Sequence, residues 1–387
     1  MKSANTVKRL CAALCLFALA GGIAAARPRD GSSGELRGRD GRPLVQIALL
    51  LDTSNSMDGL INQAKSQLWK IVSESGKMTQ NGRPVRLEVA LYEYGNDSLS
   101  ILSGYVRRVM PFTDDLDELS ARLFELDTYG GSEYCGTVIK KSLDDLDWSE
   151  RESDLKIAYV AGNEPFNQGS FDFREAGRRA VRKGVVVNTI FCGGRDEGIA
   201  TFWAEGARVT GGSYLNIDGD YEYGYVPCPQ DDRLSELNSR LNDTYIAYGA
   251  RGTARKEMQL EQDSLAEGLN KAGFYERAKV KSSASYSNST WDLVDATTSG
   301  GVPLASVKES ELPEQMRAMP KAAREAYVAE KLSERKKIQA EIAGLSAERE
   351  AWLEANKAAV TSDEALDTAI LAPLAEAARK KGFVPAK

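Results

Sequence analysis

The chain has 387 residues and a formal net charge of −6, and it contains no histidine. An acidic chain without a basic stripe lacks what phosphate backbones require, so we expect no nucleic acid among its partners. Without histidine the chain cannot build Ser-His-Asp or Cys-His catalysis, imidazole metal ligands or a histidine pH switch, and we expect that it is not an enzyme.

Residues 1–26 have the composition of a secretory signal peptide. Lys2, Lys8 and Arg9 precede an apolar stretch over residues 10–20, and residues 24–26 are alanines suited to cleavage. The apolar stretch is shorter than the roughly 20 residues that a spanning helix needs, and no later stretch is long and apolar enough. We therefore expect an exported chain, periplasmic, secreted or on the cell surface, with no transmembrane span after signal cleavage.

Residues 27–42 consist mostly of Gly, Ser, Asp and Arg and are expected to form a flexible leader. Over residues 43–246, short apolar runs alternate with helical periods, which is typical of βαβ units. Because the runs are apolar on both faces, they predict an α/β fold with a doubly wound, mostly parallel sheet between helices. The predicted strands cover residues 45–51, 87–92, 155–160, 185–192 and 213–217, and the predicted helices cover residues 57–72, 116–124, 138–143, 173–181, 199–209 and 231–245.

The first predicted strand ends in Asp52-Thr53-Ser54-Asn55-Ser56. This spacing directs one carboxylate and two hydroxyl groups toward a single point beyond the end of the strand. Hard oxygen ligands of this kind suit Mg²⁺, Ca²⁺ or Mn²⁺. The alternative is that Asp52 or Ser54 only caps the helix that follows.

With its surroundings, this D-x-S-x-S motif resembles the von Willebrand factor type A domain with a metal-ion-dependent adhesion site, of the exported bacterial type. The resemblance covers residues 43–246. It implies that Ser132, in Thr-Tyr-Gly-Gly-Ser-Glu, takes the place of the family's threonine. The family's third element is an Asp within Thr-Asp-Gly, whereas this chain has Ala-Gly-Asn163-Glu164, so either Asn163 or Glu164 is the third ligand. The implied metal ligands are Asp52, Ser54, Ser56, Ser132, Asn163 and Glu164, with Mg²⁺ expected ahead of Ca²⁺ or Mn²⁺.

Aromatic and acidic side chains near these loops are candidates for the rim of a ligand site, because aromatic rings supply rigid contact area. The expected rim residues are Tyr94, Tyr129, Glu133, Tyr134 and Phe166.

Three cysteines remain once the signal is removed, namely Cys135, Cys192 and Cys228. Cys135 and Cys192 are both expected at the same edge of the sheet. Two alternatives stay open: a disulfide between them, or separate buried thiols that behave as small hydrophobes.

Beyond residue 246 the pattern changes to a helix and a Ser/Thr-rich linker over residues 247–311, anchored by Trp291 and Leu293. Residues 312–387 then form a helical region with mixed charges, including a last helix over residues 363–381. The long helix is either a stalk for a partner or part of a helical hairpin that packs on the chain's own core. The irregular heptads favour the second interpretation over a coiled coil.

The leading hypothesis is a secreted binding or adhesion-type protein whose divalent cation engages an acidic group of a protein partner. The second hypothesis is an envelope-associated scaffold with a degenerate metal site, acting through its C-terminal helices. A metal-assisted hydrolase using Asp52, Glu133 or Glu164 as acid and base is disfavoured, because no histidine or nucleophile motif accompanies these residues. The sequence does not specify an oligomeric state.

Overall fold

The computed structural model describes residues 41–218, 224–356 and 366–385. The expected signal peptide and nearly all of the expected leader lie outside the described residues. Residues 42–387 form one compact unit. No helix in the described ranges combines the length and the apolar character that a membrane crossing requires.

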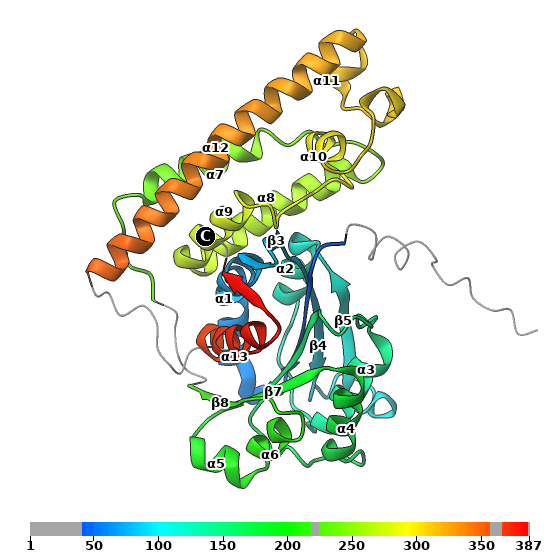
Figure 1. Cartoon of the computed structure of the whole chain (residues 1–387), viewed down its shortest axis with the longest axis vertical. Coiled ribbons are helices and arrows are strands. Elements are labelled where there is room, and N and C mark those ends of the chain that lie inside the picture. Colours follow the sequence, from blue (N-terminus) through cyan, green and yellow to red (C-terminus); the bar gives the residue numbers. More distant parts are fainter. Residues whose placement is uncertain (1–40, 219–223, 357–365, 386–387) are drawn as a thin grey trace, which may run out of the picture. The chain divides into compact units, whose positions relative to one another are not determined.

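Six strands form the central sheet, in the order β5-β4-β1-β6-β7-β8 (Figure 1). Their bounds are β1 Leu44–Asp52, β4 Arg86–Tyr94, β5 Val106–Thr113, β6 Leu155–Gly162, β7 Val186–Cys192 and β8 Tyr214–Ile217. All neighbouring strands are parallel except β4 and β5, which are antiparallel. The predicted α/β class with a mostly parallel sheet is therefore confirmed. The sequence pattern missed β5 because this edge strand carries two arginines and a proline.

Helices cover both faces of the sheet, and β1 shows why. Alternate β1 residues such as Ile47 and Leu49 join the apolar core of one face, while Ala48 and Leu50 join that of the other. The first core also receives side chains of α1 (Asp58–Gly76) and α2 (Leu116–Phe124). The second receives side chains of α3 (Cys135–Asp145), α4 (Phe173–Lys183) and α6 (Trp203–Arg208), the last preceded by α5 (Arg195–Ala200). The helix predicted over residues 199–209 is divided at Phe202, whose φ is +72°.

The last helix of the chain, α13 (Leu366–Lys380), belongs to the first face of the sheet. It contacts α1, β6 and β8 (Figure 1), and the Tyr159 hydroxyl of β6 donates a 2.7 Å hydrogen bond to the Ile370 carbonyl. We had expected the helix over residues 231–245 to complete the α/β part. Because α13 takes a place over the sheet, a boundary at residue 246 does not separate the α/β part from the C-terminal region.

The first turn of α13 is held by α1 through polar groups. The Leu366 N–H donates to Gln63 Oε1 at 3.1 Å, and the Asp367 N–H donates to Gln67 Oε1 at 2.6 Å. The carboxylate of Asp367 pairs with Lys70. After α13, β9 (Phe383–Pro385) pairs with β2 (Met78–Gln80), which also pairs with β3 (Arg83–Pro84).

Between β8 and α13 the chain forms a helical region, as expected. Its helices are α7 Asp231–Asn242, α8 Gly252–Leu269, α9 Lys271–Lys281, α10 Leu293–Thr298, α11 Glu314–Arg317 and α12 Lys321–Ala355. Of the residues in the predicted linker, Trp291 and Leu293 are buried. The 35-residue α12 buries one stripe, which includes Val328, Ile338 and Ile342, and contacts α7, α9 and α10. The long helix therefore packs on the chain's own core.

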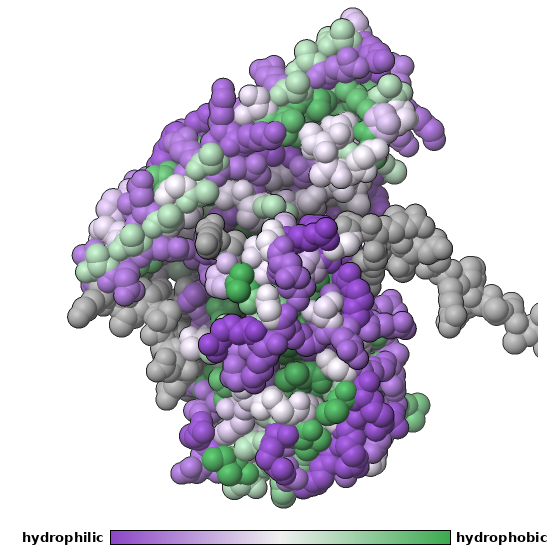
Figure 2. All heavy atoms as spheres, in the orientation of Figure 1, coloured by the Kyte–Doolittle hydropathy of each residue, from purple (hydrophilic) through white to green (hydrophobic). Residues whose placement is uncertain are grey.

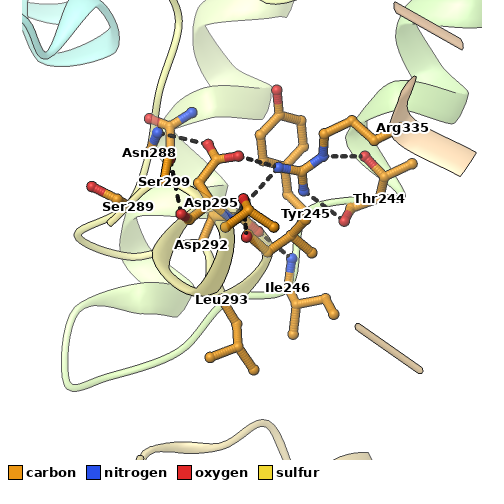
Figure 3. Close-up of polar contacts among 12 residues, drawn as sticks. Thr244, Tyr245, Ile246, Asn288, Ser289, Asp292, Leu293, Asp295, Ser299 and Arg335 are labelled. Carbon is orange, nitrogen blue, oxygen red and sulfur yellow. Dashed lines mark hydrogen bonds and ion pairs between the residues drawn. The ribbon is translucent and has the colours of Figure 1, made fainter. Parts of the chain in front are cut away.

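A buried arginine joins α12 to the segment around α10 (Figure 3). Arg335 Nη1 lies 2.6 Å from Asp292 and 2.7 Å from Asp295. Its Nη2 and Nε donate to the carbonyl and hydroxyl oxygens of Thr244 at 2.7 and 3.0 Å. The guanidinium lies 4.0 Å from the centroid of the Tyr245 ring. Every side of the buried cation thus has a partner, which is the condition for tolerating a charge in a protein interior.

Candidate metal centre

The candidate site lies at the carboxyl edge of the sheet, where β1 ends between its two parallel neighbours. Asp52 is opposite Tyr94 of β4, and Leu51 is opposite Ala161 of β6. Four loops meet at this edge, comprising residues 52–58, 95–105, 127–134 and 163–172. Sheets of this kind bind ligands outside the carboxyl ends of their strands.

Asp52 is fully buried, with 0% of its surface exposed. Its Oδ1 accepts a 2.8 Å hydrogen bond from the Ser54 N–H, whereas its Oδ2 accepts none from the described residues. The Ser54 and Ser56 hydroxyl oxygens lie 3.4 Å apart. Ser56 is exposed, so the site opens to solvent on this side. One carboxylate and two hydroxyl groups therefore converge as the motif predicted.

The second loop brings the Glu133 side chain next to Asp52. The Glu133 side chain is 2% exposed and lies within hydrogen-bonding reach of the Asp52 and Ser54 side chains. Its Oε2 also accepts a 3.3 Å hydrogen bond from the Glu164 N–H. Ser132 is half-buried. The sequence predicts Glu133 at the rim, whereas the structure buries it against Asp52.

Glycine explains how Glu133 comes so close to Asp52. A Cβ atom on Gly131 would lie 2.1 Å from the Gly95 carbonyl oxygen, and one on Gly95 would lie 2.6 Å from Asp52 Oδ1 and 2.7 Å from Glu133 Cγ. Only glycine allows these two backbones to approach. Gly95 also has a φ of +79°, which favours glycine independently.

The third loop presents Asn163 and not Glu164. Asn163 Nδ2 donates a 3.0 Å hydrogen bond to Ser56 Oγ, and Asn163 Oδ1 is buried without a donor among the described residues. The Glu164 side chain is exposed, and its carboxylate accepts a 3.1 Å hydrogen bond from Gln168 Nε2. Of the two alternatives for the third ligand, the geometry therefore favours Asn163.

The carboxyl groups of Asp52 and Glu133 have no positively charged side chain in the surrounding loops to balance them. Burial raises the pKa of the Asp52 carboxyl well above its usual range, and the adjacent Glu133 carboxyl raises this pKa further. Burial likewise raises the pKa of Glu133. The loops at residues 52–58, 95–105, 127–134 and 163–172 contain no lysine or arginine that could balance the pair. A bound cation is the remaining way to keep both carboxylates ionised at neutral pH.

The raised pKa values predict a pH dependence for the stability of the metal-free protein. The folded chain holds protons on Asp52 and Glu133 at pH values where the unfolded chain, with pKa values of about 4, has lost them. The unfolding free energy contributed by this pair therefore falls as pH rises above about 4. Urea unfolding in EDTA between pH 5 and 8 measures this fall. We expect the Asp52→Asn variant to lose less stability over this range than the wild type. Equal slopes for both proteins would contradict the assignment.

Two of the expected rim residues are in the core. Tyr94 is 0% exposed, and its hydroxyl donates to the Ala161 carbonyl at 3.0 Å. Phe166 is 0% exposed and packs edge-on against Phe173 and Trp203. Both predictions were wrong, because a ring at the end of a strand can fill the core beneath the loops. Of the other rim residues, Tyr129 is 63% exposed and Tyr134 is half-buried.

The disulfide alternative is not realised, because Cys135 and Cys192 are both free thiols. Cys135 belongs to the core on the α3 face, whereas Cys192 packs against the core on the α1 face. The sheet therefore stands between them. The Cys135 thiol lies 3.6 Å from the Tyr94 hydroxyl, and burial raises the pKa of this thiol well above its usual range.

The donor set fits a hard divalent cation. It consists of two carboxylates, two hydroxyl oxygens and one amide oxygen, all of the oxygen type that Mg²⁺ and Ca²⁺ prefer. Two of these oxygens, Asp52 Oδ2 and Asn163 Oδ1, are buried without a hydrogen-bond donor among the described residues. Within residues 41–218, 224–356 and 366–385, no three His, Cys, Asp or Glu side chains gather in a group able to hold a metal. Any ion here therefore depends on Ser54, Ser56 and Asn163 beside the two acids.

This geometry agrees with a comparison to protein families. Residues 46–198 match the von Willebrand factor type A (VWA) domain. The matched segment runs from β1 into α5 and includes every residue of the candidate metal centre. A search of curated proteins finds no match.

Among solved structures, the chain is similar to BatB from Bacteroides thetaiotaomicron, with 17% identity over 45% of this chain and 90% of that one and a TM-score of 0.35. It is also similar to the SpRpn10 VWA domain, with 14% identity over 46% and 90% and a TM-score of 0.35. Proximal thread matrix protein 1 from the mussel byssus shares 12% identity over 46% of this chain, with a TM-score of 0.34. The chain spans 42% of that mussel protein.

Proposed function

We propose that the VWA domain is a binding module that uses a divalent cation, Mg²⁺ in the first place, to hold an acidic group of a protein partner. Asp52, Ser54, Ser56, Glu133 and Asn163 are the residues that hold the ion. The observation that carries the proposal is the contact between the buried carboxyl groups of Asp52 and Glu133. Such a pair is costly in the absence of a cation, because burial and repulsion both disfavour the charged forms.

The bound ion supplies a local positive charge that a carboxylate of the partner can contact. The exposed Ser56 marks the open side of the site, so the partner approaches there. Two ligand carboxylates neutralise a divalent ion more completely than one does. The attraction for an incoming carboxylate is correspondingly lower, and partner affinity depends more on contacts around the ion.

The proposal includes export, on the basis of the signal-like residues 1–26, and a role as an interaction protein rather than an enzyme. The site contains two acids that could in principle act in catalysis. Glu133 is only 2% exposed, however, so it cannot exchange a proton directly with solvent. An acid that is occupied as a metal ligand is unavailable as a general base.

Calorimetric titration of Mg²⁺, Ca²⁺ and Mn²⁺ into the metal-free protein tests the proposal. We expect saturable binding of one ion, which Asp52→Asn abolishes because it removes the central charged ligand. Asp58→Asn is the matched control, since Asp58 is exposed at the start of α1 and its carboxylate accepts a hydrogen bond from Thr128. Absence of saturable heat with all three ions would overturn the proposal, as would equal losses in the two variants.

A further inference from the structure

The most exposed large apolar side chains of the described residues gather at the edge that carries the candidate metal centre. Leu102 is 96% exposed, Ile101 66% and Tyr129 63%. Ile101 and Leu102 lie in the short 3-10 turn Ile101–Ser103 between β4 and β5, and Tyr129 lies in the loop that leads to Glu133. We call these three residues the apolar tip. In Figure 2 an apolar group protrudes at the lower right of the α/β part, where Figure 1 draws the cyan turn after β4.

Several hydrogen bonds hold the turn that carries Ile101 and Leu102. The Gly95 N–H donates to the Tyr105 carbonyl at 3.1 Å, and the Tyr105 N–H donates to the Ser100 carbonyl at 3.2 Å. The Ser100 hydroxyl accepts a hydrogen bond from the Leu102 N–H. Tyr105 has a φ of +52°, in the left-handed region that non-glycine residues adopt infrequently. Two aliphatic side chains are therefore exposed to water on a turn that is held by hydrogen bonds.

The apolar tip is attached directly to the metal-binding loops. The Tyr105 ring packs edge-on against Tyr134, the residue after Glu133, with ring centroids 5.7 Å apart. The Tyr129 N–H donates to the Thr53 carbonyl, between Asp52 and Ser54, at 2.9 Å. The Asp97 N–H donates to the Gly130 carbonyl and so joins the loop of the turn to the loop of Tyr129. The apolar tip and the candidate metal ligands therefore lie on loops that contact one another, so a partner that reaches the ion can also contact the tip.

The charge of these loops restricts the partner. Their exposed ionisable side chains include Asp58, Asp97, Asp127 and Glu164, and the four loops contain no lysine or arginine. An anionic membrane surface or a polyacidic chain is repelled by such a surface. A partner segment with a single carboxylate, which contacts the ion, and with apolar side chains beside it is not repelled in this way. Burying Leu102 and Ile101 against a partner removes apolar surface from water and therefore favours binding.

We propose that the apolar tip is a specificity-determining part of the binding surface, and that the partner is a protein segment with one carboxylate flanked by aliphatic or aromatic residues. The carboxylate contacts the ion and the flanking residues pack on Ile101, Leu102 and Tyr129. This proposal rests on the proposed function, because the ion holds the carboxylate. It adds an apolar contact, which strengthens binding where two ligand carboxylates have reduced the charge of the ion.

A phage-displayed library of disulfide-constrained random peptides tests the proposal. Peptides are selected on the wild-type protein in Mg²⁺ and eluted with EDTA, so that only metal-dependent binders are recovered. We expect these peptides to contain one Asp or Glu with apolar neighbours. The double variant Ile101→Ser/Leu102→Ser should bind them at least about tenfold more weakly, which corresponds to about 1.4 kcal/mol. Both side chains are exposed, so the substitutions remove no packing of the folded chain.

Val181→Ser is the matched control, because Val181 is 54% exposed but lies in the last turn of α4, near the amino end of β7. We expect it to bind the peptides as the wild type does. The double variant should also bind Mg²⁺ as the wild type does, which separates the tip from the ion. If EDTA-eluted peptides bind the double variant as tightly as the wild type, the proposed role of the apolar tip is wrong, but the proposed metal-dependent function is not affected. A wild-type protein that binds Mg²⁺ but yields no EDTA-eluted peptide would overturn the proposed role of the tip too. A wild-type protein that binds no ion would overturn the proposed function first.

Discussion

Replacing Arg277 with alanine is expected to lower the free energy of unfolding by about 3–5 kcal/mol, because it leaves buried carboxylates without their cation. Arg277 is 0% exposed in α9. Its Nη1 lies 2.7 Å from Asp117 of α2 and its Nε 2.5 Å from Asp263 of α8. Its Nη2 donates to the Gln259 carbonyl at 2.9 Å. Urea unfolding measures the loss.

The neighbourhood of Arg277 shows why the charge cannot simply be removed. The Tyr286 hydroxyl donates to Asp117, and Lys281 lies 2.7 Å from Asp263 in full burial. Burial alone would raise the pKa of Asp263, but Lys281 and Arg277 outweigh it and hold this pKa well below its usual range. In the Arg277→Ala protein, Asp117 loses its only arginine among the described residues, whereas Asp263 keeps Lys281.

Two further variants distinguish the effect of losing a buried charge from the effect of losing any arginine. Arg122→Ala removes an exposed arginine of α2 whose ion pairs with Glu118 and Glu125 lie at the surface, so we expect a loss below about 1 kcal/mol. Adding Asp117→Asn to Arg277→Ala removes the unpaired charge and should restore part of the stability. Equal losses in Arg277→Ala and Arg122→Ala would show that the buried network does not stabilise the fold.

This network also shows that the helical region packs directly against the segment that matches the VWA family. Arg277 belongs to the helical region, but Asp117 lies inside the segment that matches the VWA family, and the guanidinium lies 4.5 Å from the ring centroid of Trp69 in α1. At the other end, α13 returns to the sheet and is held by Gln63 and Gln67 of α1. The helical region is thus inserted between β8 and the last helix of the α/β part, and we expect that truncation after residue 246 exposes the α13 face of the core.

The parallel strands of the central sheet and the loop that begins at Asp52 were predictable from the sequence because their signals are local. An apolar run such as residues 45–51 has to be buried on both faces, and Asp52, Ser54 and Ser56 are related by spacing alone. The position of α13 was not predictable, because an amphipathic pattern shows that one face of a helix is covered but not which part of the chain covers it.

Glu133 could not be distinguished from Ser132 by sequence. Both follow the glycine pair, and the choice depends on how closely Gly131 approaches the Gly95 carbonyl, which is a contact between residues 36 positions apart. Likewise, nothing local separates the buried Tyr94 from the exposed Tyr129. A signal was nevertheless present: an acid in a glycine-rich loop that also carries the expected metal ligand is a candidate ligand itself.

The second acid of the candidate metal centre is expected to have a large effect on metal affinity. Glu133 is buried against Asp52, whereas Glu164 is exposed and bonded to Gln168. Glu133→Gln keeps the shape of the side chain but removes the second ligand charge, so we expect affinity for Mg²⁺ to fall at least about tenfold. Glu164→Gln changes only a surface charge near the site and should alter affinity by no more than about twofold.

Calorimetric titration of Mg²⁺ into the metal-free wild type, Glu133→Gln and Glu164→Gln proteins is the most direct test. We expect the wild type to bind Mg²⁺ most tightly, Glu164→Gln to bind it almost as tightly, and Glu133→Gln to bind it far more weakly. Wild-type affinity in Glu133→Gln together with a strong loss in Glu164→Gln would contradict the account, because it would place the exposed carboxylate on the ion in place of the buried one.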